Sequence, residues 1–108
     1  MPRSYIALGS NQGDPVQQVQ TACGALRELP RSQLVACSSL YRSAPMGPQD
    51  QPSYINAVLA LDTELEPAAL LDNLQRIELE HGRVRKAERW GPRTLDLDIL
   101  LYGDQLIR

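Results

Sequence analysis

The chain has 108 residues, 43% of them hydrophobic, which fits one small domain, and we expect residues 1–108 to form a single unit. A net charge of −2 excludes strong attraction of the whole chain to nucleic acid or to a membrane surface. Two cysteines make neither a disulfide framework nor a cysteine-rich metal site, and without a signal peptide or membrane-spanning apolar run we expect a cytoplasmic protein.

The first third of the chain predicts a strand, a helix and a second strand. Residues 5–8 form an apolar run that stops at Gly9, which is typical of a strand followed by a turn. Asp14 and Pro15 suit the N-cap and the first position of a helix. The expected buried stripe of this helix comprises Val16, Val19, Ala22, Cys23, Leu26 and Leu29. Residues 34–41 alternate as the second strand, and we expect both cysteines, Cys23 and Cys37, to be small core residues.

The rest of the chain predicts a loop, a strand, a helix and a final strand. Residues 43–52 contain three prolines and a glycine, which excludes regular structure there. Residues 53–61 predict the third strand, and residues 95–102 predict the fourth. Between them a helix begins near Pro67. Its expected buried stripe comprises Leu70, Leu71, Leu74 and Ile77.

The order β-α-β-β-α-β predicts an α+β fold of the ferredoxin-like kind, with helices packed on an antiparallel sheet in strand order 4-1-3-2. This arrangement brings the ends of strands 1 and 2 to the same edge as the starts of strands 3 and 4. The starts of strands 3 and 4 then lie about 10 Å apart, because strand 1 separates them. A site that spans this distance has room for two substrates.

Two carboxylates one residue apart are the first candidate functional feature. In a strand, Asp96 and Asp98 project from the same face, while Leu97 and Ile99 project from the other. A regular strand would continue the face of the acids through Tyr102. Mg²⁺ takes one or two protein carboxylates together with substrate phosphates, so the pair favours a magnesium site. The alternative is a pair of exposed acids on an edge strand.

A basic segment precedes the carboxylate pair. Six of the eleven basic residues lie close together: Arg76, Arg83, Arg85, Lys86, Arg89 and Arg93. Arginine suits two-point contacts with phosphate, and the flanking glycines favour a loop that closes over a substrate. A solvated charged loop is the alternative. Trp90 could stack on a flat ring or pack on its own loop.

Asn56 and Tyr54 form another pair on one face, at the start of the third strand. An asparagine side chain offers a donor and an acceptor, and it can therefore read the amide-like edge of a heterocycle. The alternative is a strand-start residue that caps a turn.

The segment Arg89-Trp-Gly-Pro-Arg-Thr-Leu-Asp-Leu-Asp-Ile-Leu100 closely resembles the signature of the 6-hydroxymethyl-7,8-dihydropterin pyrophosphokinases, which are enzymes of folate biosynthesis. The likeness extends along the chain through residues 6–11, 41–57 and 75–85. It implies transfer of the β,γ-diphosphate of ATP to the hydroxymethyl oxygen of the pterin, with release of AMP.

The same resemblance implies roles for particular residues. Asp96 and Asp98 would hold two Mg²⁺ ions, and Arg83 and Arg93 would stabilise the transferring phosphates. The residues implied in ATP binding are Gln75, Glu78, Arg85, Arg89, Trp90 and Arg93. Those implied in pterin binding are Ser43, Ala44, Pro45, Met46, Tyr54 and Asn56.

Members of this family continue beyond the fourth strand, whereas the present sequence stops at Arg108. We therefore expect an open ATP site and exposed apolar surface, which would allow self-association. One alternative function is a catalytically impaired fragment that binds pterin or pairs with a partner chain. A second is an RNA-binding ferredoxin-like module, although the chain lacks the aromatic platform of RNA-recognition domains.

Overall fold

A computed structural model describes residues 1–44, 53–80, 95–103 and 105–106. The elements in chain order are β1 (Arg3–Ser10), α1 (Pro15–Arg27), β2 (Ser32–Cys37), β3 (Tyr41–Ser43), β4 (Tyr54–Thr63), α2 (Pro67–Glu80), β5 (Asp96–Tyr102) and β6 (Gln105–Leu106). Neither of the described helices is long and apolar enough to cross a membrane.

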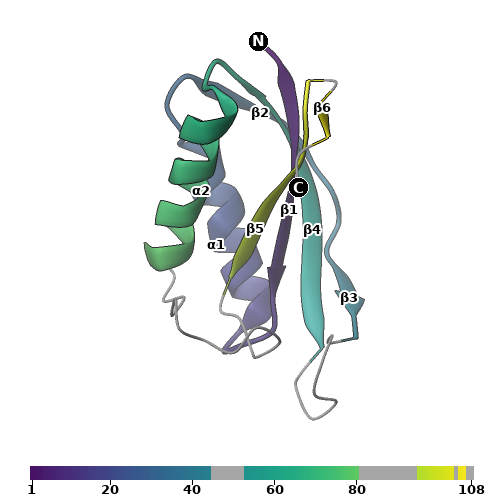
Figure 1. Cartoon of the computed structure of the whole chain (residues 1–108). Helices are drawn as coiled ribbons and strands as arrows, with labels where there is room; N and C mark the ends of the chain where they lie inside the picture. The colour runs from purple at the N-terminus through teal and green to yellow at the C-terminus, as the bar shows by residue number, and fades with distance from the viewer. Residues whose placement is uncertain (45–52, 81–94, 104, 107–108) are drawn as a thin grey trace.

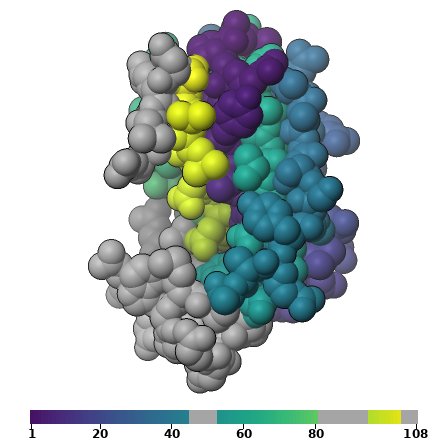
Figure 2. Space-filling model, turned by 90° about the vertical axis from the view of Figure 1, so that its right-hand side faces the viewer, coloured from purple at the N-terminus to yellow at the C-terminus, as the bar shows by residue number. Residues whose placement is uncertain are grey.

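The strands form one antiparallel sheet in the order β2-β4-β1-β5-β6, and β3 also pairs with β4. Both helices pack on one side of this sheet (Figure 1). Figure 2 looks onto the opposite side, where β5, β1 and β4 lie next to one another. The predicted α+β fold and strand order are confirmed, since the four long strands follow the order 4-1-3-2. We call the side without helices the open face.

The predicted second strand, residues 34–41, is wrong as a single element. It consists of β2 and β3, which pair with different parts of β4. Ser38 lies between them, and its hydroxyl oxygen accepts the backbone N–H of Val58 at 2.9 Å. Because a side-chain oxygen replaces a backbone acceptor there, the regular ladder is interrupted.

The core lies between the helices and the sheet. Among the described residues it contains 17 buried side chains, including Ile6, Leu26, Leu59 and Leu74, all 0–1% exposed. Two positions of the predicted helical stripes are wrong, because Val16 is 40% exposed and Leu71 is 42% exposed. Both lie at the borders of their stripes, where a helix turns its surface away from the sheet.

A bulge divides β5 into two parts. Tyr5 of β1 pairs with Leu101 while Ile6 pairs with Ile99, so Leu100 has no counterpart on β1. Because of the extra residue, each side chain after the bulge projects from the opposite face to the one that regular alternation would give it. Tyr102 is therefore buried on the helix side, where its hydroxyl donates to the carbonyl of Leu65. The expectation that Tyr102 shares the face of the acids was wrong for this reason.

Asp14 begins α1 as the sequence predicts, and its Oδ1 accepts the backbone N–H of Gln17 at 3.2 Å. We expect Asp14→Ala to lower the free energy of unfolding by about 1 kcal/mol, because that N–H loses its acceptor. Urea unfolding followed by circular dichroism measures the difference. Asp72→Ala, an exposed change inside α2, is the control and should stay within about 0.5 kcal/mol of the parent protein. Equal losses in the two variants would contradict the capping role.

Candidate active site

Three adjacent strands place two candidate site residues and a glycine in one row. Gly9 of β1 pairs with Asn56 of β4 on one side and with Asp96 of β5 on the other. Directly paired residues of antiparallel strands project from the same face. The side chains of Asn56 and Asp96 therefore flank Gly9 on the open face, about 10 Å apart, which is twice the interstrand spacing.

The absence of a side chain at Gly9 is part of this geometry. A Cβ at this position would lie 3.1 Å from Oδ1 of Asn56 and 3.7 Å from the ring of Tyr54. The predicted end of the first strand at Leu8 was wrong, because β1 continues through Gly9 to Ser10. The glycine at the end of the apolar run could have indicated this crowded position, since a glycine inside a strand often marks the close approach of another group.

The carboxylates of Asp96 and Asp98 share the open face, as predicted. Leu97 and Ile99 are only 3% and 6% exposed, which shows that they face the core, whereas Asp96 is half-buried and Asp98 is exposed. Asp98 pairs with Ala7, so the neighbours of the two acids on β1 are a glycine and an alanine. Neither of these two neighbours on β1 has a large side chain beside the carboxylates.

This donor set fits magnesium better than a metal that prefers nitrogen or sulfur ligands. Within the described ranges there is no group of three or more histidine, cysteine, aspartate or glutamate side chains that could hold a metal ion. Two carboxylates on one face suit Mg²⁺, which keeps several waters and takes its other ligands from substrate phosphates.

A hydrogen bond to β3 orients the Asn56 side chain. Its Nδ2 donates to the hydroxyl of Ser43 at 2.7 Å, across the pairing of β3 with β4. Tyr54 lies two residues earlier on the same face and is half-buried, and Ser43 and Ala44 are exposed. An amide held by one hydrogen bond can present its remaining groups to a ligand with little loss of entropy.

Glu78 supports the strand that carries the acids. It is only 5% exposed, and its Oε2 accepts the backbone N–H of Leu97, between the two aspartates, at 2.8 Å. In the described part of the chain β6 pairs only with Leu101 and Tyr102. The carboxylate of Glu78 therefore supplies the acceptor that a neighbouring strand would otherwise provide. Sequence reasoning did not identify this contact.

The other predicted site residues are divided between α2 and the part of the chain that the structure does not describe. Gln75 lies on α2, one turn before Glu78, and is exposed. Seven candidates lie outside the described residues: Pro45, Met46, Arg83, Arg85, Arg89, Trp90 and Arg93. In the sequence, the segment with five of these candidates lies between Glu80, the last residue of α2, and Asp96, the first residue of β5.

The fold and the site define a ferredoxin-like α+β protein with paired carboxylates on an open sheet face. Residues 5–107 match the family model of 7,8-dihydro-6-hydroxymethylpterin-pyrophosphokinase. The chain therefore belongs to this family, and the resemblance drawn from residues 89–100 is confirmed.

Curated relatives agree with this assignment. The chain is 61% identical over 105 residues to the 2-amino-4-hydroxy-6-hydroxymethyldihydropteridine pyrophosphokinase of Pseudomonas aeruginosa, covering 97% of this chain and 64% of that protein. It is 58% identical over 108 residues to the protein of the same name from Haemophilus influenzae, covering 100% of this chain and 67% of that protein. A folic acid synthesis protein of Schizosaccharomyces pombe is 42% identical over 101 residues, which is 94% of this chain and 14% of that protein.

Proposed function

We propose that the protein transfers the terminal diphosphate of ATP to the hydroxymethyl group of 6-hydroxymethyl-7,8-dihydropterin, giving AMP and the pterin diphosphate. Family membership supports pyrophosphoryl transfer in folate biosynthesis. The observation that carries the proposal is the row Asn56, Gly9 and Asp96, in which an amide and a carboxylate flank a position without a side chain. The proposal places the reaction in the cytoplasm, without a nucleic acid or membrane partner.

The carboxylate end of the row is assigned to ATP. Asp96 and Asp98 would hold two Mg²⁺ ions. When bound, Mg²⁺ would neutralise phosphate charge and make the pterin hydroxyl more acidic. Arg83 and Arg93 are assigned to the transferring phosphates, where a planar guanidinium can donate two hydrogen bonds. The remaining assignments to ATP binding are Gln75, Arg85, Arg89 and Trp90. Glu78 would act on this site indirectly, because its buried carboxylate accepts the backbone N–H of Leu97.

The amide end of the row is assigned to the pterin. Asn56 would donate to and accept from the ring edge, and Tyr54 would pack on the ring. Ser43 is the last residue of β3, and Ala44 follows it. These two residues, with Pro45 and Met46, are also assigned to pterin binding. A separation of about 10 Å across β1 accommodates a pterin beside a polyphosphate. Catalysis is then mainly positioning of the hydroxymethyl oxygen in line with the β-phosphorus.

The direct test measures AMP formation from Mg-ATP with and without the hydroxymethyl pterin, using the full 108-residue chain. Pterin-dependent AMP and pterin diphosphate in equal amounts would support the proposal. ATP hydrolysis that does not depend on pterin would contradict it. Pterin binding without turnover would favour a catalytically impaired chain, whereas RNA binding independent of Mg²⁺ would favour the nucleic-acid alternative.

We expect Asn56→Ala to weaken pterin binding by about 10- to 100-fold, because a ligand group that pairs with the amide would lose its partner on binding. Fluorescence titration of the pterin measures the dissociation constant. Asn73→Ala is the matched control, since Nδ2 of Asn73 donates to the carbonyl of Ala69 within α2. An unchanged dissociation constant in the Asn56 variant would remove this residue from the pterin site.

A further inference from the structure

The two cysteines of the chain lie next to each other although they are 14 positions apart in the sequence. Sγ of Cys23 on α1 is 3.3 Å from Sγ of Cys37 on β2. Both are free thiols. The expectation of two core residues was wrong for Cys37, which is exposed, because β2 is an edge strand of the sheet. Cys23 is half-buried beneath it.

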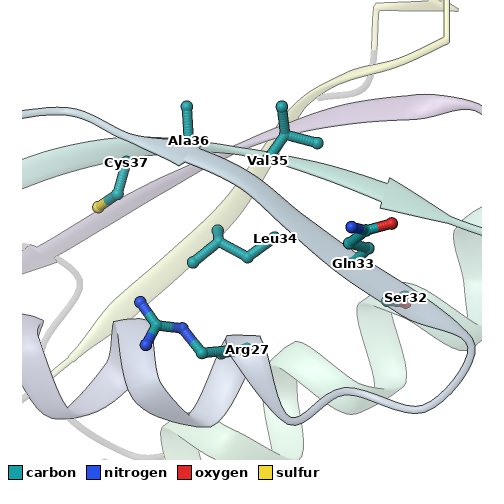
Figure 3. A pocket seen from close by; sticks show the side chains of 7 residues that line it. All are labelled: Arg27, Ser32, Gln33, Leu34, Val35, Ala36 and Cys37. Carbon is teal, nitrogen blue, oxygen red and sulfur yellow. The ribbon is translucent and has the colours of Figure 1, made fainter.

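A bulge in β2 turns Cys37 toward α1. The pairing of β2 with β4 shifts between Leu34 and Ala36. Figure 3 shows the result: Leu34 and Cys37 point toward the helix, whereas Val35 and Ala36 both point away from it. Without the extra residue, strand alternation would place Leu34 and Cys37 on opposite faces.

An open pocket lies beside Cys37 (Figure 3). Its volume is about 490 Å³, and its lining consists of Arg27, Ser32, Gln33, Leu34, Val35, Ala36 and Cys37. Arg27 reaches it from the last turn of α1 and supplies a positive charge. Backbone groups of an edge strand and the Gln33 amide offer hydrogen bonds. This lining suits a small anionic peptide rather than an apolar molecule.

We propose that Cys37 and Cys23 form a reversible intramolecular disulfide by exchange with a small anionic disulfide, for which glutathione disulfide is the probe. In the first step the Cys37 thiolate attacks one sulfur of the probe. A Cys37–glutathione bond forms and one glutathione thiolate leaves. In the second step the Cys23 thiolate attacks Cys37 Sγ and releases the second glutathione. Two protein thiols are oxidised and one glutathione disulfide is reduced to two glutathione thiols, which take up the two protons that the protein thiols lose.

The order of the two steps follows from the environments of the sulfurs. Cys37 is exposed at the pocket, whereas burial raises the pKa of the Cys23 thiol to about 12, with a further contribution from its contact with Cys37. A thiol that is rarely ionised attacks slowly. Cys23 therefore acts as the second nucleophile, on a sulfur that is already in contact with it. This inference does not depend on the proposed transferase activity, because β2 and β5 lie in different parts of the sheet.

The test incubates the reduced full-length chain with glutathione disulfide and follows intact mass. The parent protein should lose two hydrogen atoms and regain them on treatment with a reducing agent. Cys23→Ser should accumulate one bound glutathione, at least about tenfold faster than Cys37→Ser. Serine is nearly isosteric with cysteine, and circular dichroism of both variants is the check that they are folded.

Thermal unfolding gives a second readout. The oxidised parent protein should unfold a few degrees higher than the reduced protein, because the bond restricts the unfolded chain, and neither single variant should show this shift. Two results would overturn the proposal. One is a parent protein that keeps its mass under exchange conditions that modify free cysteine. The other is a parent protein that stops at a stable glutathione adduct or forms only disulfide-linked dimers.

Discussion

Replacement of Asp96 or Asp98 by asparagine should lower pterin-dependent AMP formation by at least about 10²- to 10³-fold, the loss typical of removing one preorganised charge at a reacting centre. Asparagine keeps the size of aspartate but not its charge, so the change separates electrostatics from packing. Both acids project from the open face and neither belongs to the core. The variants should therefore keep the stability of the parent protein within about 1 kcal/mol.

Asp62→Asn is the matched control for both variants. Asp62 is also on a central strand, but it pairs with Arg3 at the far end of β1, about 20 Å from the row that contains Gly9. Its activity should equal that of the parent protein. A second readout, Mg²⁺-dependent binding of a non-hydrolysable ATP analogue, should weaken in the two site variants only. Full activity in either site variant would exclude that acid from metal binding.

Glu78→Ala should lower the free energy of unfolding by about 2–4 kcal/mol. The change removes a buried side chain and leaves the N–H of Leu97 without its acceptor. Since Leu97 lies between the two aspartates, the loss should also loosen the carboxylates and raise the Mg²⁺ concentration needed for activity. Urea unfolding and a magnesium titration of AMP formation measure the two effects.

Two substitutions test whether the effect comes from this one contact. Glu78→Gln keeps an oxygen that can accept the N–H, so it should lose less stability than the alanine variant. Glu80→Ala removes an exposed glutamate two residues later, which pairs with Arg76 on the same helix. An exposed pair of this kind contributes about 0.5 kcal/mol or less. If the Glu78 and Glu80 variants were equally stable, the support of β5 by α2 would be refuted.

The parts of the fold that the sequence predicted are those that depend on local patterns. Asp14 followed by Pro15 identifies the start of a helix, because capping involves neighbours within three residues. The alternation of Asp96 and Asp98 with Leu97 and Ile99 fixes which side of a strand faces water. Element order then restricts the topology, and the sheet order follows. The facing of the carboxylates was predictable for the same reason.

What the sequence did not predict depends on partners far along the chain. The interruption at Ser38 depends on the backbone of Val58, and the burial of Glu78 depends on Leu97. Bulges leave the residue pattern almost unchanged while they reverse the facing of every later residue. The proximity of Cys23 to Cys37 combines both causes, since it needs a bulge and a helix-to-strand contact.

The bulge at Leu100 lets one strand meet two opposite demands. A seven-residue strand with perfect alternation and acids at its first and third positions would direct its last side chain outward as well. Tyr102 would then no longer belong to the core, and the carbonyl of Leu65 would lose the hydrogen bond that Tyr102 donates. Because Leu100 is unpaired, the first part of β5 directs its acids to the open face, whereas the last part directs Tyr102 into the core. The bulge therefore allows one short strand both to expose polar side chains to dissolved ligands and to pack against the helix side of the sheet.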